Sequence, residues 1–219
     1  MKLKKNFLLV SFIYALCGTY AFSQEPEPIF DDKLLLNGYA EKYTDASKEV
    51  LMAMIEDDTL SPYKTAAAIR VFREKYSREV FKTDKRIALK TILRCLARSD
   101  SSFIQVEIMH TLCLMNRYKY FESMVPNLIQ KLNHYNDTVS ELSYAALDTI
   151  IKNGQNRPRE ARLIFNTLRK QMFATRKKLR GITEPSPELK RQLELLRWAI
   201  KILGNEELRR LPSEVIAHL

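Results

Sequence analysis

The sequence contains few glycines and no strand-like pattern. Only five of its 219 residues are glycine, and no stretch keeps the alternation of apolar and polar residues that a half-buried strand requires. Sheet proteins built from many short strands need frequent glycine-containing turns. We therefore expect an all-α fold.

The sequence also lacks the motifs of common catalytic sites. It has no G-x-x-x-x-G-K-[ST] phosphate loop, no G-x-G-x-x-G, no H-E-x-x-H and no G-x-S-x-G. His110 and Cys113 lie three residues apart, a spacing that could place both on one metal ion, but an isolated pair of this kind is usually coincidental. We expect no enzymatic activity, no cofactor and no metal site.

Cysteine is also scarce. Of the three cysteines, Cys17 lies in the N-terminal apolar segment, which leaves Cys95 and Cys113 for the body of the protein. On two antiparallel helices joined near Ser99, their offset is roughly eight residues, or about 12 Å, which is too far for a disulfide. We expect both to be small core residues.

The N-terminus resembles a secretory signal peptide. Three lysines precede a ten-residue, largely apolar segment at positions 7–16, and Ala21-Phe22-Ser23 forms a small-x-small cleavage site. The prediction is that residues 1–23 are removed and that the protein is periplasmic or secreted. Retention of this segment as a membrane anchor and lipidation of Cys17 remain alternatives. Beyond Ser23, no apolar run is long enough to cross a bilayer.

After this segment the chain divides by composition. Residues 24–33 are acidic and contain prolines, which predicts a flexible lead-in. Residues 34–211 carry apolar residues three and four apart, the period of amphipathic helices. Polar breaks divide them into helical hairpins, and a short helix is expected to close the end at 212–219. The four hairpins are expected at residues 46–76, 84–116, 120–154 and 158–204.

The hairpins recur at a regular spacing. Asp58, Asp100 and Asp137 each stand just before the second helix of a pair, at separations of 42 and 37 residues. A period near 40 with two helices per unit is typical of a helical solenoid. One hairpin leaves an apolar face uncovered, so successive hairpins must stack. We expect about four stacked units.

The third hairpin carries a family resemblance. Its first helix contains Val125-Pro126-Asn127-Leu128, and its second contains an Ala146-Leu147 step. Residues 121–154 therefore resemble a HEAT repeat, whose first helix often carries a proline. The other hairpins match in period and pattern more than in residue identity. The resemblance implies a right-handed α-solenoid and does not specify a function.

Charge is distributed unevenly along the chain. Residues 24–58 contain ten acidic and three basic residues, whereas residues 157–191 contain three acidic and eleven basic ones. The densest group of cations, called the basic cluster below, is the predicted partner-binding site. It consists of Arg157, Arg159, Arg162, Arg169, Lys170, Arg176, Lys177, Lys178 and Arg180.

Several kinds of partner fit this distribution of charge. A protein with an acidic surface is the first, and an anionic membrane or cell-wall polymer is the second. Nucleic acid is disfavoured because an exported protein would not meet it. The acidic and basic ends also suggest head-to-tail self-association. We expect a non-catalytic scaffold or adaptor; the alternatives are a structural component of an envelope assembly and, less favoured, an enzyme on a helical-repeat body.

Overall fold

The computed structural model describes residues 31–80, 85–154 and 156–219. Throughout these residues every regular element is a helix and no strand occurs, which confirms the all-α prediction. The elements are α2 (Asp32–Lys42), α3 (Lys48–Glu56), α4 (Pro62–Val80), α5 (Lys85–Arg98), α6 (Ser102–Met115), α7 (Arg117–Lys131), α8 (Asp137–Lys152), α9 (Arg157–Thr175), η1 (Arg176–Leu179), α10 (Pro187–Leu203), η2 (Asn205–Arg210) and α11 (Ser213–Ile216).

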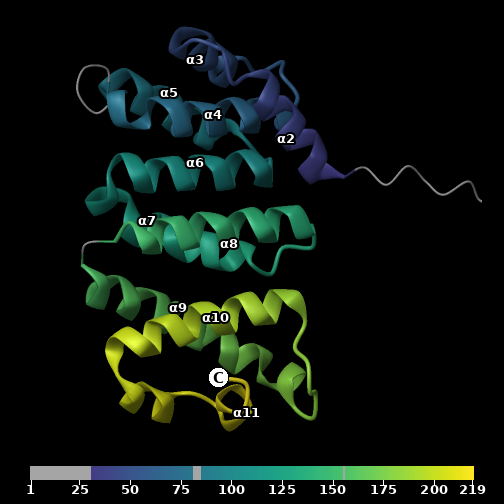
Figure 1. The fold of residues 1–219 in the computed structure, drawn as a ribbon, viewed down its shortest axis with the longest axis vertical. Helices are drawn as coiled ribbons and strands as arrows, with labels where there is room; N and C mark the ends of the chain where they lie inside the picture. Colours follow the sequence, from purple (N-terminus) through teal and green to yellow (C-terminus); the bar gives the residue numbers. More distant parts are fainter. Residues whose placement is uncertain (1–30, 81–84, 155) are drawn as a thin grey trace, which may run out of the picture. The chain divides into compact units, whose positions relative to one another are not determined.

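The long helices of residues 32–219 pack on their neighbours in a regular order. Helix α3 contacts α4, α5 contacts α6, α7 contacts α8, and α9 contacts α10. In addition, α2, α4, α6 and α8 contact one another in that order, and the same relation joins α3 to α5 and α7 to α9. Figure 1 shows α4, α6 and α8 at successive levels. Helices α3 to α9 therefore pack both on a helix next to them in the sequence and on a helix two places away along the chain.

Side-chain caps explain where several helices begin. The Ser47 hydroxyl accepts the Val50 amide N–H at the start of α3, and the Asn136 side chain accepts the Val139 amide N–H at the start of α8. Helix α7 begins at Arg117 rather than near residue 120, because Asn116 caps it through the Lys119 amide N–H. The expected start of the second hairpin, residue 84, lies outside the described residues.

Helix α2 was not anticipated from the sequence. Its apolar pattern is weak, and Leu36 is the residue that it buries. The Asp32 carboxylate accepts hydrogen bonds from the Tyr63 hydroxyl (2.6 Å) and from Asn136 Nδ2 (2.5 Å). These contacts fix the start of α2 against α4 and the cap of α8. Residues 32 and 33, expected to end the flexible lead-in, are therefore helical, while residues 24–30 lie outside the described part.

The C-terminal end differs in detail from the prediction, and most of the N-terminal segment lies outside the described residues. The closing helix expected over 212–219 corresponds to the shorter α11, Ser213–Ile216, and the 3-10 helix η2 at Asn205–Arg210 precedes it. The expected signal peptide, residues 1–23, falls in a part of the chain that the structure does not describe. Among the helices of the described residues, none is both long and apolar enough to cross a membrane.

A buried ionic triad joins α4 to α6. Glu107 of α6 is 2 % exposed; it pairs with Arg70 at 2.8 Å and also with Arg73. Burial alone would raise the pKa of Glu107, but the two guanidinium groups together hold it below its ordinary value. Asn37 of α2 accepts a further hydrogen bond from Arg70 at 2.8 Å. Arg70 therefore links α2, α4 and α6 by contacting both Asn37 and Glu107.

Replacement of this carboxylate should be strongly destabilising. We expect Glu107→Gln to lower the free energy of unfolding by about 3 kcal/mol, because two largely buried guanidinium groups lose their counter-charge. The folded-state pKa of Glu107 is lowered, so its contribution is present above about pH 4.3, the ordinary glutamate pKa, and is lost as pH falls below it. Urea unfolding from neutral to acidic pH tests both points.

The matched control removes an exposed carboxylate. Glu122 pairs with Arg159, and both side chains are more than half exposed. Glu122→Gln should change the free energy of unfolding by less than about 1 kcal/mol. Equal effects of the two substitutions would contradict the structural role assigned to the triad.

Gly154 lies against a second buried ion pair. Arg117 at the start of α7 contacts Glu160 of α9 at 2.5 Å and donates to the Ile150 carbonyl at 2.6 Å. A Cβ atom on Gly154 would collide with Glu160 Oε2 and would lie 2.8 Å from Arg117 Nη2. The absence of a side chain at Gly154 thus leaves room for the bond between α7 and α9.

Two glycine substitutions should have opposite effects. Gly154→Ala should destabilise the protein by about 2 kcal/mol, because a methyl group would displace the Arg117–Glu160 pair. Gly38→Ala should stabilise it by about 1 kcal/mol, because Gly38 lies within α2 and an added Cβ meets nothing within 4 Å. Thermal unfolding of both variants measures the difference, and stabilisation by Gly154→Ala would contradict this packing.

Candidate functional site

The basic cluster lies on α9 and η1. Arg157, Arg159, Arg162, Arg169 and Lys170 follow α9, whereas Arg176, Lys177 and Lys178 form most of η1 and Arg180 directly follows it. All except Arg169, which is partly buried, are exposed. The structure therefore gathers the last four cations of the cluster on one short turn.

Three arginines of the basic cluster form ion pairs with carboxylates. Arg159 pairs with Glu122 of α7, and Arg162 pairs with the largely buried Glu207 of η2. Arg180 pairs with Glu214 of α11 at 2.9 Å. These pairs link helices and use up the positive charge of the three arginines.

The remaining cations are not held in ion pairs. Arg176 donates to the Phe173 carbonyl, a neutral acceptor. Within the described chain, five members have no carboxylate within ion-pair distance: Arg157, Arg169, Lys170, Lys177 and Lys178. Net positive charge therefore concentrates where Arg176, Lys177 and Lys178 follow one another on η1.

The basic turn η1 is anchored to the rest of the protein. Leu179 is 2 % exposed and fixes the turn in the core. His218 Nε2 lies 3.2 Å from the Leu179 carbonyl, and α11 packs on η1. The three exposed cations are thus carried by a turn whose backbone is fixed, so a partner would meet them already ordered.

Loss of this anchor should release the turn. Leu179→Ala should lower the free energy of unfolding by about 3 kcal/mol, because a fully buried leucine leaves a cavity. Trypsin cleavage after residues 176–180 should accelerate relative to other sites. Ile182→Ala, at a residue 37 % exposed, is the control and should change neither quantity appreciably. Unchanged cleavage in the Leu179 variant would contradict the anchoring role.

A second basic surface lies on α5 and was missed by the sequence analysis. Arg86, Lys90 and Arg94 are exposed at successive turns of α5, and Lys119 of α7 lies nearby. With the half-buried Leu89 and Leu93 and with other residues, they line an open cavity of about 510 Å³. The sequence contains a signal for this surface, because residues 85–98 include no acidic residue. The comparison of charge between residues 24–58 and residues 157–191, which predicted the basic cluster, does not include this segment.

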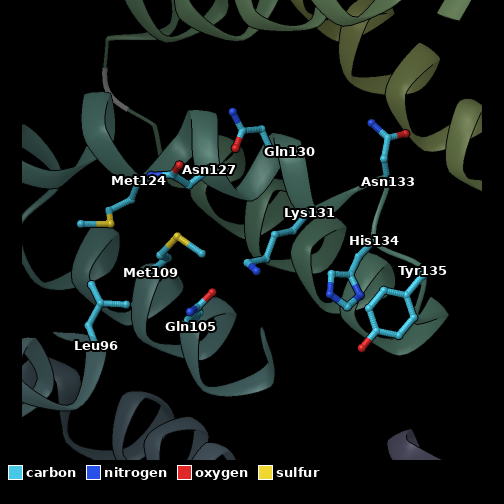
Figure 2. Close-up of a pocket in the computed structure, with 10 residues that line it drawn as sticks. All are labelled: Leu96, Gln105, Met109, Met124, Asn127, Gln130, Lys131, Asn133, His134 and Tyr135. Carbon is cyan, nitrogen blue, oxygen red and sulfur yellow. The ribbon is translucent and has the colours of Figure 1, made fainter. Parts of the chain in front are cut away.

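A groove of about 710 Å³ lies beside α5, α6 and α7 and is called the α5–α7 groove below. Figure 2 shows the side chains that line it. They come from α5, from α6, from α7 and from the turn before α8: Leu96; Gln105 and Met109; Met124, Asn127, Gln130 and Lys131; and Asn133, His134 and Tyr135. One end is apolar, and the other presents amides, a histidine and the ammonium group of Lys131.

Lys131, Ser102 and His134 form a hydrogen-bonded group at the polar end. Lys131 Nζ donates to Ser102 Oγ at 3.1 Å, and His134 Nε2 lies 3.0 Å from the same oxygen. Burial lowers the pKa of Lys131, and burial together with the charge of Lys131 lowers the pKa of His134. At neutral pH the imidazole is therefore neutral, and Lys131 carries the formal charge of the groove.

This geometry does not make Ser102 a nucleophile. The Asn136 amide N–H donates to His134 Nδ1 at 3.1 Å, which leaves the ring hydrogen on Nε2 in the neutral tautomer. His134 therefore faces Ser102 as a donor and not as a base. The arrangement presents positive potential and hydrogen-bond donors, which suits binding of an anion better than activation of a hydroxyl.

The remaining titratable core residues are structural. Cys95 and Cys113 are free and buried, as expected, and burial raises the pKa of both thiols, that of Cys113 to about 12. His110 is held at a pKa of about 3 by burial and by the nearby charge of Arg73. Across residues 31–80, 85–154 and 156–219, no three His, Cys, Asp or Glu side chains meet as a group that could hold a metal ion.

Comparisons with known proteins add no assignment. No protein-family model matches the chain, and searches of curated proteins and of solved structures find no match. The resemblance of residues 121–154 to a HEAT repeat therefore remains a hypothesis from the sequence.

Proposed function

We propose that this protein is an exported, non-catalytic scaffold or adaptor built as a right-handed HEAT-like α-solenoid. In this proposal it binds an acidic protein partner through the basic cluster. This proposal rests on the anchored turn η1, whose backbone is fixed by Leu179. Its cations Arg176, Lys177 and Lys178 are exposed and form no ion pair with a described residue. The pKa of Glu188 is lowered mainly by local hydrogen bonds, and the charge of Lys178 helps to lower it.

The side-chain bonds between helices support the repeat architecture. Thr91 reaches Glu56 across 35 residues, and Arg70 reaches Glu107 across 37. Arg159 reaches Glu122 across 37 residues as well. These separations are close to the expected period near 40, as they would be if each helix contacted its counterpart in the next unit.

Electrostatic steering is the mechanism that we propose for recognition. Exposed cations on a fixed turn attract an acidic surface before contact and thereby raise its association rate. Because the turn is already ordered, docking should require little loss of conformational entropy from this protein. Arg162 and Arg180 have a different role in this scheme, since their carboxylate partners hold η2 and α11 in place.

Neutralisation of the turn should slow binding without unfolding the protein. With fluorescent poly-glutamate as the acidic probe, the triple variant Arg176→Gln, Lys177→Gln, Lys178→Gln should associate about tenfold more slowly at low salt. Its association rate should also depend less on salt concentration. The free energy of unfolding should change by less than about 1 kcal/mol, because all three side chains are exposed. Stopped-flow fluorescence and urea unfolding provide the measurements.

The matched control removes the same charge elsewhere. Arg86→Gln, Lys90→Gln and Arg94→Gln together neutralise three exposed cations of α5. If η1 is the docking site, this variant should bind the probe nearly as fast as the wild type. A larger decrease in association rate for the α5 variant would place the docking site on α5. Equal decreases for the two variants would mean that only the net charge of the protein matters, which would contradict a site at η1. Crosslinking in cells from position 177 would then identify the natural partner.

A further inference from the structure

The α5–α7 groove has an electrostatic character set by one side chain. Lys131 is the single formally charged residue that lines it, and none of the carboxylates that the structure describes forms an ion pair with this lysine. Its ammonium group is held by one neutral contact, the Ser102 hydroxyl. A lysine partly withdrawn from water without a counter-ion favours the approach of an anion.

The surroundings of Lys131 reinforce this preference. Ser102 is the first residue of the 14-residue helix α6, whose N-terminus carries partial positive charge. His134 is fixed with its Nε2 hydrogen toward Ser102 by the Asn136 amide. The polar end of the groove therefore presents donors and positive potential, and the residues that line it include no carboxylate.

The other end of the groove suits an apolar group. Leu96 comes from α5, Met109 from α6 and Met124 from α7. In the view of Figure 2, Lys131 lies between the two methionines and the His134–Tyr135 pair. Methionine side chains adapt to ligands of irregular shape. A ligand here can thus place an apolar substituent beside an anionic group.

Two glutamine side chains at the groove can hydrogen-bond to a peptide backbone. Gln105 donates from Nε2 to the Ser99 carbonyl at 3.0 Å, which leaves its Oε1 as an acceptor. Gln130 makes no side-chain hydrogen bond to any part of the chain that the structure describes, so it offers both a donor and an acceptor. The cavity of about 710 Å³ falls within the range of about 300–1,000 Å³ for sites that take compact ligands.

We propose that the α5–α7 groove binds the free C-terminus of a peptide that ends in an apolar residue. The terminal carboxylate pairs with Lys131, the last side chain packs between Leu96, Met109 and Met124, and the final peptide group hydrogen-bonds to Gln105 and Gln130. A fatty acid carries the same carboxylate and apolar group but has no peptide group for the two glutamines. This site is separate from the basic cluster and does not depend on its function.

The test compares matched ligands on the full chain by isothermal titration. The probe is acetyl-Ala-Ala-Leu-Leu with a free carboxylate; its C-terminal amide and octanoate are the two comparisons. We expect the acid to bind at least about tenfold more tightly than the amide, because a charge-assisted hydrogen bond is lost. Weaker binding of octanoate supports a peptide ligand, whereas tighter binding of octanoate would overturn the peptide assignment in favour of a fatty acid.

Three variants locate the site. Lys131→Met should weaken acid binding about tenfold and remove the preference over the amide, whereas Lys131→Arg, which keeps the charge, should retain that preference. Lys170→Met, which removes an exposed cation of α9, should change nothing. Absence of acid binding to the wild type, or unchanged binding by a folded Lys131→Met variant, would overturn the proposal.

The outcome is separable from that of the scaffold proposal. The triple variant of Arg176, Lys177 and Lys178 should bind the tetrapeptide acid as the wild type does. Conversely, Lys131→Met should leave poly-glutamate association at η1 nearly unchanged. Loss of tetrapeptide binding in the triple variant would place the peptide on the basic cluster and contradict the groove.

Discussion

Helix α6 imposes the main constraint on this fold, because it packs against four other helices. It contacts α4, α5, α7 and α8, and ten of its fourteen residues are buried, including Glu107, His110 and Thr111. Buried polar groups are costly without partners; His110 Nε2 has none among the described residues, whereas Thr111 and Glu107 are satisfied. The Thr111 hydroxyl donates to the Glu107 carbonyl at 2.7 Å, and Arg70 and Arg73 of α4 neutralise Glu107. The position of α4 is therefore fixed by charge as well as by apolar packing.

The same constraint separates two kinds of cation. Arg73, Arg117 and Arg162 pair with the buried carboxylates Glu107, Glu160 and Glu207, and each pair joins different elements. Removal of one partner from such a pair leaves an uncompensated charge inside the protein. The cations of η1 and those lining the α5 cavity lie outside these pairs. The excess positive charge of the chain is consequently placed on exposed surfaces, where it can act on other molecules.

The sequence predicted those features that depend on short-range pattern. The stripe containing Val125, Leu128 and Ile129 gave a helix with the correct buried face, because three- and four-residue spacing is a local property. Helix α2 was missed because its anchors, Tyr63 and Asn136, lie 31 and 104 residues from Asp32. The nine cations of the basic cluster were treated as equivalent, although Arg162 pairs with Glu207 across 45 residues.

The α5–α7 groove could not be predicted, because three helices and a turn contribute to it. Ser102 and His134 lie 32 residues apart, and the sequence contains no signal that they meet. The orientation of the His134 ring depends on a backbone hydrogen bond from Asn136, which has no sequence motif. A charge count assigns Lys131 to the solvent like any other lysine. Its partial burial and its lack of an ion pair with a described carboxylate become visible only in three dimensions.

The turn at His134 and Tyr135 lies beside both proposed sites. Both residues line the α5–α7 groove and also a neighbouring cavity of about 300 Å³. That second cavity is also lined by Lys178 of η1 and by two carboxylates, Asp137 and Glu188. Tyr135 is 93 % exposed and stacks on His134 with ring centroids 4.3 Å apart. An acidic chain running from the groove past this tyrosine toward Lys178 would meet the Asp137 and Glu188 carboxylates and be repelled, so the α5–α7 groove and η1 act as separate sites in these proposals.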